Sequence, residues 1–247
     1  MAKRADRPRS LLVSVVVSVC ALGALTAVSL LSPHVHDEVA WRQPLTGSLF
    51  SVVCILGMTA VFFPQRCARR PSMHPGNQRQ ASPQRQDVYQ TTSAIAGITL
   101  THGHHPPCER YYQHEFLFGG KTLCAACTGL FTGALISLAA ACYVFLLQRP
   151  YNLPYGLASA VGALGVIVGV VSYAVTNAQG PTRRFFVNAV MVVGMLLALI
   201  GADGSGQSLA LNVLIIGSCM LALFTRILLS QDRHERICRT CEQACVA

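Results

Sequence analysis

The sequence predicts an all-α fold, a polytopic membrane bundle of about six transmembrane helices. Of the 247 residues, 52% are hydrophobic and only 12% are charged, about half the charged fraction of an ordinary soluble domain. Six apolar stretches reach the roughly 20 residues that a helix needs to cross about 30 Å of hydrocarbon. The basic residues fall almost entirely on one side of these stretches. A soluble globule, a disordered chain, a coiled coil and a disulfide-stapled miniprotein are therefore excluded.

The predicted spans follow one another along the chain with polar segments between them. The first is apolar for more than 20 residues and has no small-residue cleavage site, so we expect an uncleaved helix rather than a signal peptide. The apolar run Ile95–Leu100 is too short to cross a membrane. The six spans are expected at Leu11–Ser32, Leu45–Phe63, Leu123–Leu147, Leu153–Val175, Phe185–Ala202 and Leu209–Leu229.

Composition divides the chain into three parts. Residues 1–63 form an N-terminal transmembrane hairpin. Residues 64–93 are rich in Pro, Gln, Arg and Ser, which is typical of a mobile polar linker. Residues 94–247 form a four-span core, which includes a Cys/His segment at 102–127 and a Cys-containing tail at 230–247.

The distribution of charge predicts the orientation. Only Arg42 and Arg149 fall in the predicted outer loops, which leaves 17 of the 19 Lys and Arg residues on the inner side. We therefore expect a multi-pass protein of the cell membrane with both termini in the cytoplasm. The net charge of +9 then reflects topology and attraction to anionic lipids at the cytoplasmic face, and no nucleic-acid partner is implied. The sequence identifies no protein partner.

The predicted spans carry almost no ionisable groups, and none at mid-span, which disfavours ion-coupled transport. Two glycine pairs, Gly129-x3-Gly133 and Gly165-x3-Gly169, favour close helix packing within the chain; the alternative is a dimer interface, so a homo-oligomer stays open. Polar side chains expected to hydrogen-bond between helices are Ser14, Ser18, Asn188, Asn212 and Ser218.

The eleven cysteines are unevenly placed. Four lie inside predicted spans, where cysteine behaves as a small hydrophobic residue. The outer loops contain none, which argues against a disulfide framework and favours reduced thiols with metal or redox chemistry. The other seven all lie on the predicted cytoplasmic side: Cys67, Cys108, Cys124, Cys127, Cys238, Cys241 and Cys245.

The most specific motif is His105-x2-Cys108 followed, after 15 residues, by Cys124-x2-Cys127. This is the spacing of structural zinc sites, because each x2 turn presents two donor atoms on one side and two turns complete a tetrahedron. Gly119-Gly120 allows the chain to reverse between the two pairs. Other histidines are alternative nitrogen ligands: His102, His104 and His114.

The tail adds Cys238-x2-Cys241-x3-Cys245. If the last span continues as a helix, these residues lie on one face. They could complete a four-thiolate site with Cys124 and Cys127, form a second zinc site, hold an iron–sulfur cluster, or be reactive or lipidated thiols.

A competing chemistry is thiol–disulfide exchange, with Cys124 as nucleophile and Cys127 as the resolving cysteine. A CxxC at the start of a membrane helix resembles the quinone-linked thiol oxidases of bacterial and vitamin-K-cycle type. Those families place the motif near the non-cytoplasmic side with partner cysteines in outer loops, which this sequence lacks, so the redox hypothesis is the weaker one.

One further resemblance covers residues 102–140. The run His104-His105-Pro106-Pro107-Cys108-Glu109-Arg110, then Gly119-Gly120, then Cys124 to Gly129, resembles a prokaryotic, archaeal-like family of multi-pass membrane proteins of unknown function. This chain departs from it at Ala126, where many members have arginine, and at Tyr111-Tyr112, where Ser-Phe is common. The resemblance implies the membrane fold and the metal site, and it implies no reaction.

The sequence therefore predicts a non-enzymatic integral membrane protein with a cytoplasmic structural zinc site and no assigned catalytic residue. The predicted ligands are His105, Cys108, Cys124, Cys127, Cys238 and Cys241, with His102, His104, His114 and Cys245 as additional candidates. The alternatives are a membrane thiol–disulfide oxidoreductase, an iron–sulfur electron-transfer protein, or a metal-sensing or metal-transport protein.

Overall fold

The chain is an integral membrane protein with six candidate spans. A computed structural model describes residues 9–31, 40–62, 91–95, 98–102, 114–118, 121–148, 153–175 and 180–239. Six helices in this part of the chain are long and apolar enough to cross a membrane, which confirms the predicted spans. They are α1 (Arg9–Leu31), α2 (Arg42–Phe62), α4 (Ala125–Ala141) with its π-helical continuation η4 (Cys142–Leu146), α5 (Tyr155–Val175), α6 (Pro181–Gly206) and α7 (Leu209–Arg239).

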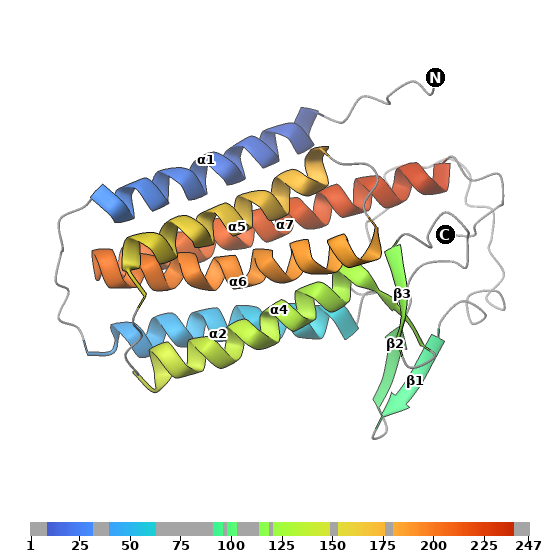
Figure 1. Cartoon of the computed structure of the whole chain (residues 1–247), viewed down its shortest axis with the longest axis horizontal. Coiled ribbons are helices and arrows are strands. Elements are labelled where there is room, and N and C mark those ends of the chain that lie inside the picture. Colours follow the sequence, from blue (N-terminus) through green and yellow to red (C-terminus); the bar gives the residue numbers. More distant parts are fainter. Residues whose placement is uncertain are drawn as a thin grey trace, which may run out of the picture.

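The helices alternate in direction, so α1 begins and α7 ends at the same end of the bundle (Figure 1). Helix α6 is central and packs mainly against α5 and α4, with further contacts to α7 and α1. Helix α1 lies against α7 and α5, whereas α2 lies against α4, η4 and α7. The N-terminal hairpin therefore does not pack as a separate unit, because its two helices lie against different parts of the core.

The bundle carries apolar side chains both inside and outside. Met191, Ala198 and Leu199 of α6 are fully buried in the core. Large apolar side chains are also exposed along the outward faces of the helices, for example Val16, Leu164 and Phe224. An apolar exterior suits a protein whose surrounding solvent is lipid.

Glycines set the close approach of α4 and α5 to α6. A Cβ atom at Gly129 would lie 2.2 Å from the carbonyl oxygen of Phe185, and one at Gly162 would lie 2.2 Å from the backbone nitrogen of Ala198. Gly133, Gly165 and Gly169 also face α6, at Ala189, Val190 and Met191. The prediction that both glycine pairs pack within the chain is confirmed.

Three of the five polar side chains expected to bond between helices do so. The Ser18 Oγ and Thr225 Oγ1 atoms of α1 and α7 lie 2.9 Å apart. Asn188 of α6 donates to the Tyr173 hydroxyl of α5 over 2.8 Å, and Asn212 of α7 donates to Thr46 of α2 over 3.1 Å. The hydroxyl groups of Ser14 and Ser218 instead donate to carbonyl groups of their own helices.

Two antiparallel hairpins add to the expected all-α bundle. Strands β1 (Thr91–Ile95) and β2 (Ile98–His102) form one hairpin; β3 (Glu115–Phe118) and β4 (Lys121–Cys124) form the other. The chain reverses between Phe118 and Lys121, and the predicted turn residues Gly119-Gly120 lie outside the described residues. The short apolar run at 95–100 falls within the first hairpin. The predicted linker 64–93 lies outside the described residues except for 91–93, which begin β1.

The described basic residues gather at one end of the bundle. Arg9 begins α1, Lys121 begins β4, Arg183 and Arg184 lie in the first turn of α6, and Arg233, Arg236 and Arg239 lie in the last turns of α7. These element ends are at the end of the bundle that carries the hairpins (Figure 1). Arg226 of α7 contacts Tyr173 near the end of α5. Among the residues that the structure describes, Arg42 is the one basic residue at the opposite end.

The fifth helix extends beyond its predicted bounds and takes in charged residues near both ends. Helix α6 begins four residues earlier and ends four residues later than predicted, so Arg184 and Asp203 both lie inside it. Both side chains are buried, as is that of Arg226 in α7. The predicted fifth span stops short of the first charged residue on each side, because it is based on hydropathy alone. The helix itself continues past these residues, because their charged groups have polar partners within the bundle.

Candidate functional site

The Cys124-x2-Cys127 motif lies at the junction of β4 and α4. Cys124 is the last residue of β4 and the N-cap of α4, with extended backbone angles, and Cys127 lies in the first helical turn. Both side chains are half-buried, neither is in a disulfide, and their thiol groups hydrogen-bond to each other. The change from strand to helix therefore places two sulfur atoms side by side at the start of a membrane span.

The β3–β4 hairpin leads the preceding segment back to this thiol pair. In its register, Glu115 lies opposite Cys124. His114, directly before Glu115, is buried. Strand β2, which ends at His102, also contacts β4. Glu115 therefore lies beside Cys124, and β2 contacts the strand that ends at this cysteine.

Within the described part of the chain, however, no three His, Cys, Asp or Glu side chains converge as a metal site. Of the predicted ligands, only Cys124 and Cys127 are seen together. Cys238 lies in the last turn of α7, which confirms that the helix continues past the span, but its side chain lies outside the described residues. The same holds for the side chain of His102 and for all of His104, His105, Cys108, Cys241 and Cys245.

Beside the thiol pair lies a cluster that sequence reasoning missed. We refer to Tyr173, Arg184, Asn188, Arg226 and Arg233 as the arginine–tyrosine cluster; all five side chains are buried. Arg226 donates through Nη2 to the Tyr173 hydroxyl over 3.1 Å, and its guanidinium lies 4.7 Å from the ring centroid. Arg233 donates through Nη2 to the Tyr173 carbonyl over 2.8 Å, with its guanidinium 5.5 Å from the same centroid. Arg184 also hydrogen-bonds to the Tyr173 side chain.

The cluster and the thiol pair share an electrostatic environment. Arg226 interacts with Cys127, and Arg184 interacts with Cys124. The first turn of α4 adds its unpaired amide groups and the positive end of its dipole. The guanidinium groups and the helix N-terminus together make the local potential positive. A sequence signal existed, since Tyr173, Arg184 and Arg226 each lie near the end of an apolar stretch, but nothing in the sequence showed that they meet.

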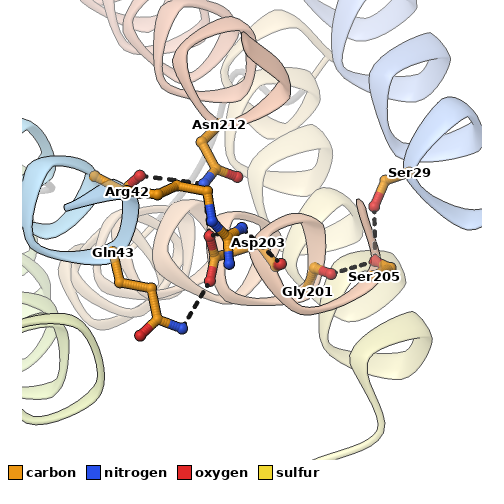
Figure 2. A network of polar contacts seen from close by, with 8 residues as sticks. Ser29, Arg42, Gln43, Gly201, Asp203, Ser205 and Asn212 are labelled. Atoms are coloured by element: carbon orange, nitrogen blue, oxygen red, sulfur yellow. Dashed lines mark hydrogen bonds and ion pairs between the residues drawn. The ribbon is translucent and has the colours of Figure 1, made fainter. Parts of the chain in front are cut away.

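A second buried network lies at the opposite end of the bundle (Figure 2). The Arg42 guanidinium donates to the Asp203 carboxylate over 2.7 Å, and both side chains are less than one-tenth exposed. Asn212 donates to the same carboxylate over 2.7 Å, and Gln43 donates to its other oxygen over 3.5 Å. Ser205 lies 3.0 Å from Ser29 of α1, so the end of α6 contacts both helices of the N-terminal hairpin (Figure 2).

The two networks have different chemistry. At the Asp203 end, the positive charge of Arg42 is paired with the Asp203 carboxylate, so this network connects helices and has a structural role. At the Cys124 end, thiols and guanidinium groups are gathered beside two hairpins, which makes this end the candidate functional site.

No protein-family model, curated protein or solved structure matches the chain in comparisons with known proteins.

Proposed function

We propose that this chain is a non-enzymatic membrane protein whose Cys/His segment binds a structural zinc ion at the cytoplasmic end of the bundle. Cys124 and Cys127 would supply two thiolate ligands. The observation that carries the proposal is their contact at the N-terminus of α4, since two sulfur donors side by side are half of a tetrahedral zinc site. A site with four protein ligands leaves no open position for a reacting water molecule.

The remaining ligands are proposed from the spacing of the motif. His105 and Cys108 precede the β3–β4 hairpin, and its register brings the preceding chain toward Cys124. Cys238 and Cys241 are the alternative source, because α7 continues as a helix to Arg239 at the same end of the bundle (Figure 1). The gathering of basic residues at this end supports its cytoplasmic placement.

Metal analysis of the full-length protein purified in detergent under anaerobic conditions tests this proposal. We expect about one equivalent of zinc per chain, or two if the tail forms its own site, and a colourless sample. The Cys124→Ala/Cys127→Ala double variant should lose the zinc and unfold at a lower temperature, because binding energy of a structural metal is folding energy. Addition of a chelator should lower the unfolding temperature of the wild type in the same way.

The matched control is Cys20→Ala, which removes an exposed thiol from α1, far from the motif. It should retain wild-type zinc and stability. Equal zinc in the double variant and in this control would contradict the proposal. Iron with inorganic sulfide and a brown colour would replace zinc with an iron–sulfur cluster.

A second candidate function is thiol–disulfide exchange, and one observation favours it. Cys124 caps a helix, interacts with Arg184 and hydrogen-bonds to Cys127, so a potential nucleophile and a resolving thiol lie together at a helix N-terminus. Alkylation at pH 6–7 separates the two functions. Rapid labelling of one thiol without chelator favours exchange, whereas protection that a chelator removes favours zinc.

A further inference from the structure

Arg226 of the arginine–tyrosine cluster is a buried cation whose hydrogen bond and ring contact are to a neutral side chain. At the other end of the bundle, buried Arg42 lies 2.7 Å from a carboxylate. Arg226 is equally buried, at 5% exposure, yet its hydrogen bond and ring contact are both to Tyr173, a neutral side chain. No described carboxylate lies within ion-pair distance of Arg226. A buried guanidinium that faces no carboxylate is costly, so this position favours a negatively charged ligand.

Arg226 also has a buried hydrogen-bond donor that Tyr173 does not satisfy. Arg226, Asn188 and Arg184 all direct hydrogen bonds to the Tyr173 hydroxyl, whose oxygen has two lone pairs. The Nε atom of Arg226 is buried and has no hydrogen-bond partner among the described residues. A group that brings acceptor oxygens and negative charge would satisfy both the charge and the Nε donor of Arg226.

Two helix N-termini lie beside the cluster. Arg184 is in the first turn of α6, and α4 begins next to it, since Gly129 packs directly on the Phe185 backbone. Their dipoles add to the positive potential of the guanidinium groups. Among anions, phosphate matches best, because its oxygens accept paired hydrogen bonds from the planar guanidinium fork.

We propose that the arginine–tyrosine cluster binds a phosphate-bearing anion at the cytoplasmic end of the bundle, with Arg226 as its principal ligand. The phosphate can belong to the headgroup of an anionic phospholipid or to a free phosphate ion. This site is separate from the zinc site, because it uses nitrogen donors of α6 and α7 rather than the thiols of α4.

Phosphorus analysis of the full-length protein purified in mild detergent tests the proposal. Extraction with organic solvent separates lipid phosphorus from aqueous phosphate, so the two sources are distinguished in one sample. We expect the wild type to retain phosphorus. The amount of phosphorus per chain in Arg226→Gln should be lower by a factor of roughly ten or more, because a hydrogen bond to a charged group is lost. Arg183→Gln is the matched control, because Arg183 is exposed at the same end of α6 and carries the same charge. It should retain the wild-type amount.

Binding is then measured directly. Wild-type protein in phosphatidylcholine nanodiscs should be thermally stabilised by phosphatidylglycerol in the disc, by inorganic phosphate, or by both, and Arg226→Gln should lose this response. If Arg226→Gln does not fold, Arg226→Lys keeps the charge without the fork and should bind more weakly than wild type.

Three results would overturn the proposal. One is equal phosphorus in the wild type, Arg226→Gln and Arg183→Gln. Another is wild-type protein that holds no phosphorus and responds to neither probe. The third is loss of zinc from Arg226→Gln with unchanged phosphorus, which would make the arginine a partner of the thiolate site. Zinc is measured in the same samples, so failure of the zinc proposal is recognised separately.

Discussion

Asp203→Ala is expected to lower the free energy of unfolding in detergent by about 3–5 kcal/mol, the typical cost of leaving one member of a buried ion pair alone. The variant would leave the Arg42 guanidinium without its ion-pair partner; the Arg42 side chain is 9% exposed and lies 2.7 Å from the carboxylate in the native protein. It would also remove the acceptor of Asn212 and Gln43. Because Arg42 begins α2, the loss should loosen the N-terminal hairpin first. Chemical unfolding followed by circular dichroism measures it.

The matched control is Asp232→Ala. Asp232 forms an ion pair of 3.0 Å with Arg236 one turn along α7, and both side chains are partly exposed. Its removal should cost about 1 kcal/mol or less. Arg42→Met/Asp203→Leu should recover much of the loss, since it leaves no buried charge alone. If Asp203→Ala costs no more than Asp232→Ala, the buried pair does not hold α2 to α6 and α7.

Gly162→Ala is expected to destabilise the protein by about 3 kcal/mol, the upper part of the range for overpacking. The added methyl group would lie 2.2 Å from the Ala198 nitrogen and 2.6 Å from the Gly194 carbonyl oxygen, both in the backbone of α6. Backbone atoms within a helix cannot rotate aside, so α5 and α6 would have to separate. Thermal unfolding in detergent, followed by circular dichroism, checks the prediction.

Gly217→Ala is the control for this substitution. Gly217 lies in α7, and a Cβ atom there would have nothing within 4 Å. The same chemical change should be neutral, or stabilise the helix by up to about 1 kcal/mol through its better helix propensity. A similar loss at both positions would mean that close packing of α5 on α6 is not what Gly162 provides.

The number and position of the spans could be predicted because crossing a membrane is a local property of the chain. A segment either has enough consecutive apolar residues to span the hydrocarbon or it does not, and its backbone must bond to itself. The intramolecular use of Gly129 and Gly133 was predictable for a related reason, since small residues at helical spacing allow close approach on one face. The spacing of Cys124 and Cys127 likewise predicts that their thiol groups lie together.

The partnership of distant polar residues was not predictable in this way. Arg42 and Asp203 are separated by 161 positions, and both lie just outside the apolar stretches. A hydropathy scale places a charged residue outside the membrane, because it gives the free energy of burying that side chain alone, with no ion-pair partner. Once a partner shares the cost, the charge can be buried and the helix can continue past it.

The sequence by itself determined that this is a six-span membrane protein and where its thiols lie along the chain, since length, apolarity and spacing are properties of single segments. Tertiary structure alone decided that Tyr173 meets Arg226 and Arg233, and that Arg42 meets Asp203. Burial of these groups depends on three-dimensional pairing. Which charge is balanced by a carboxylate, and which is left to attract an anion, follows from how α5, α6 and α7 pack.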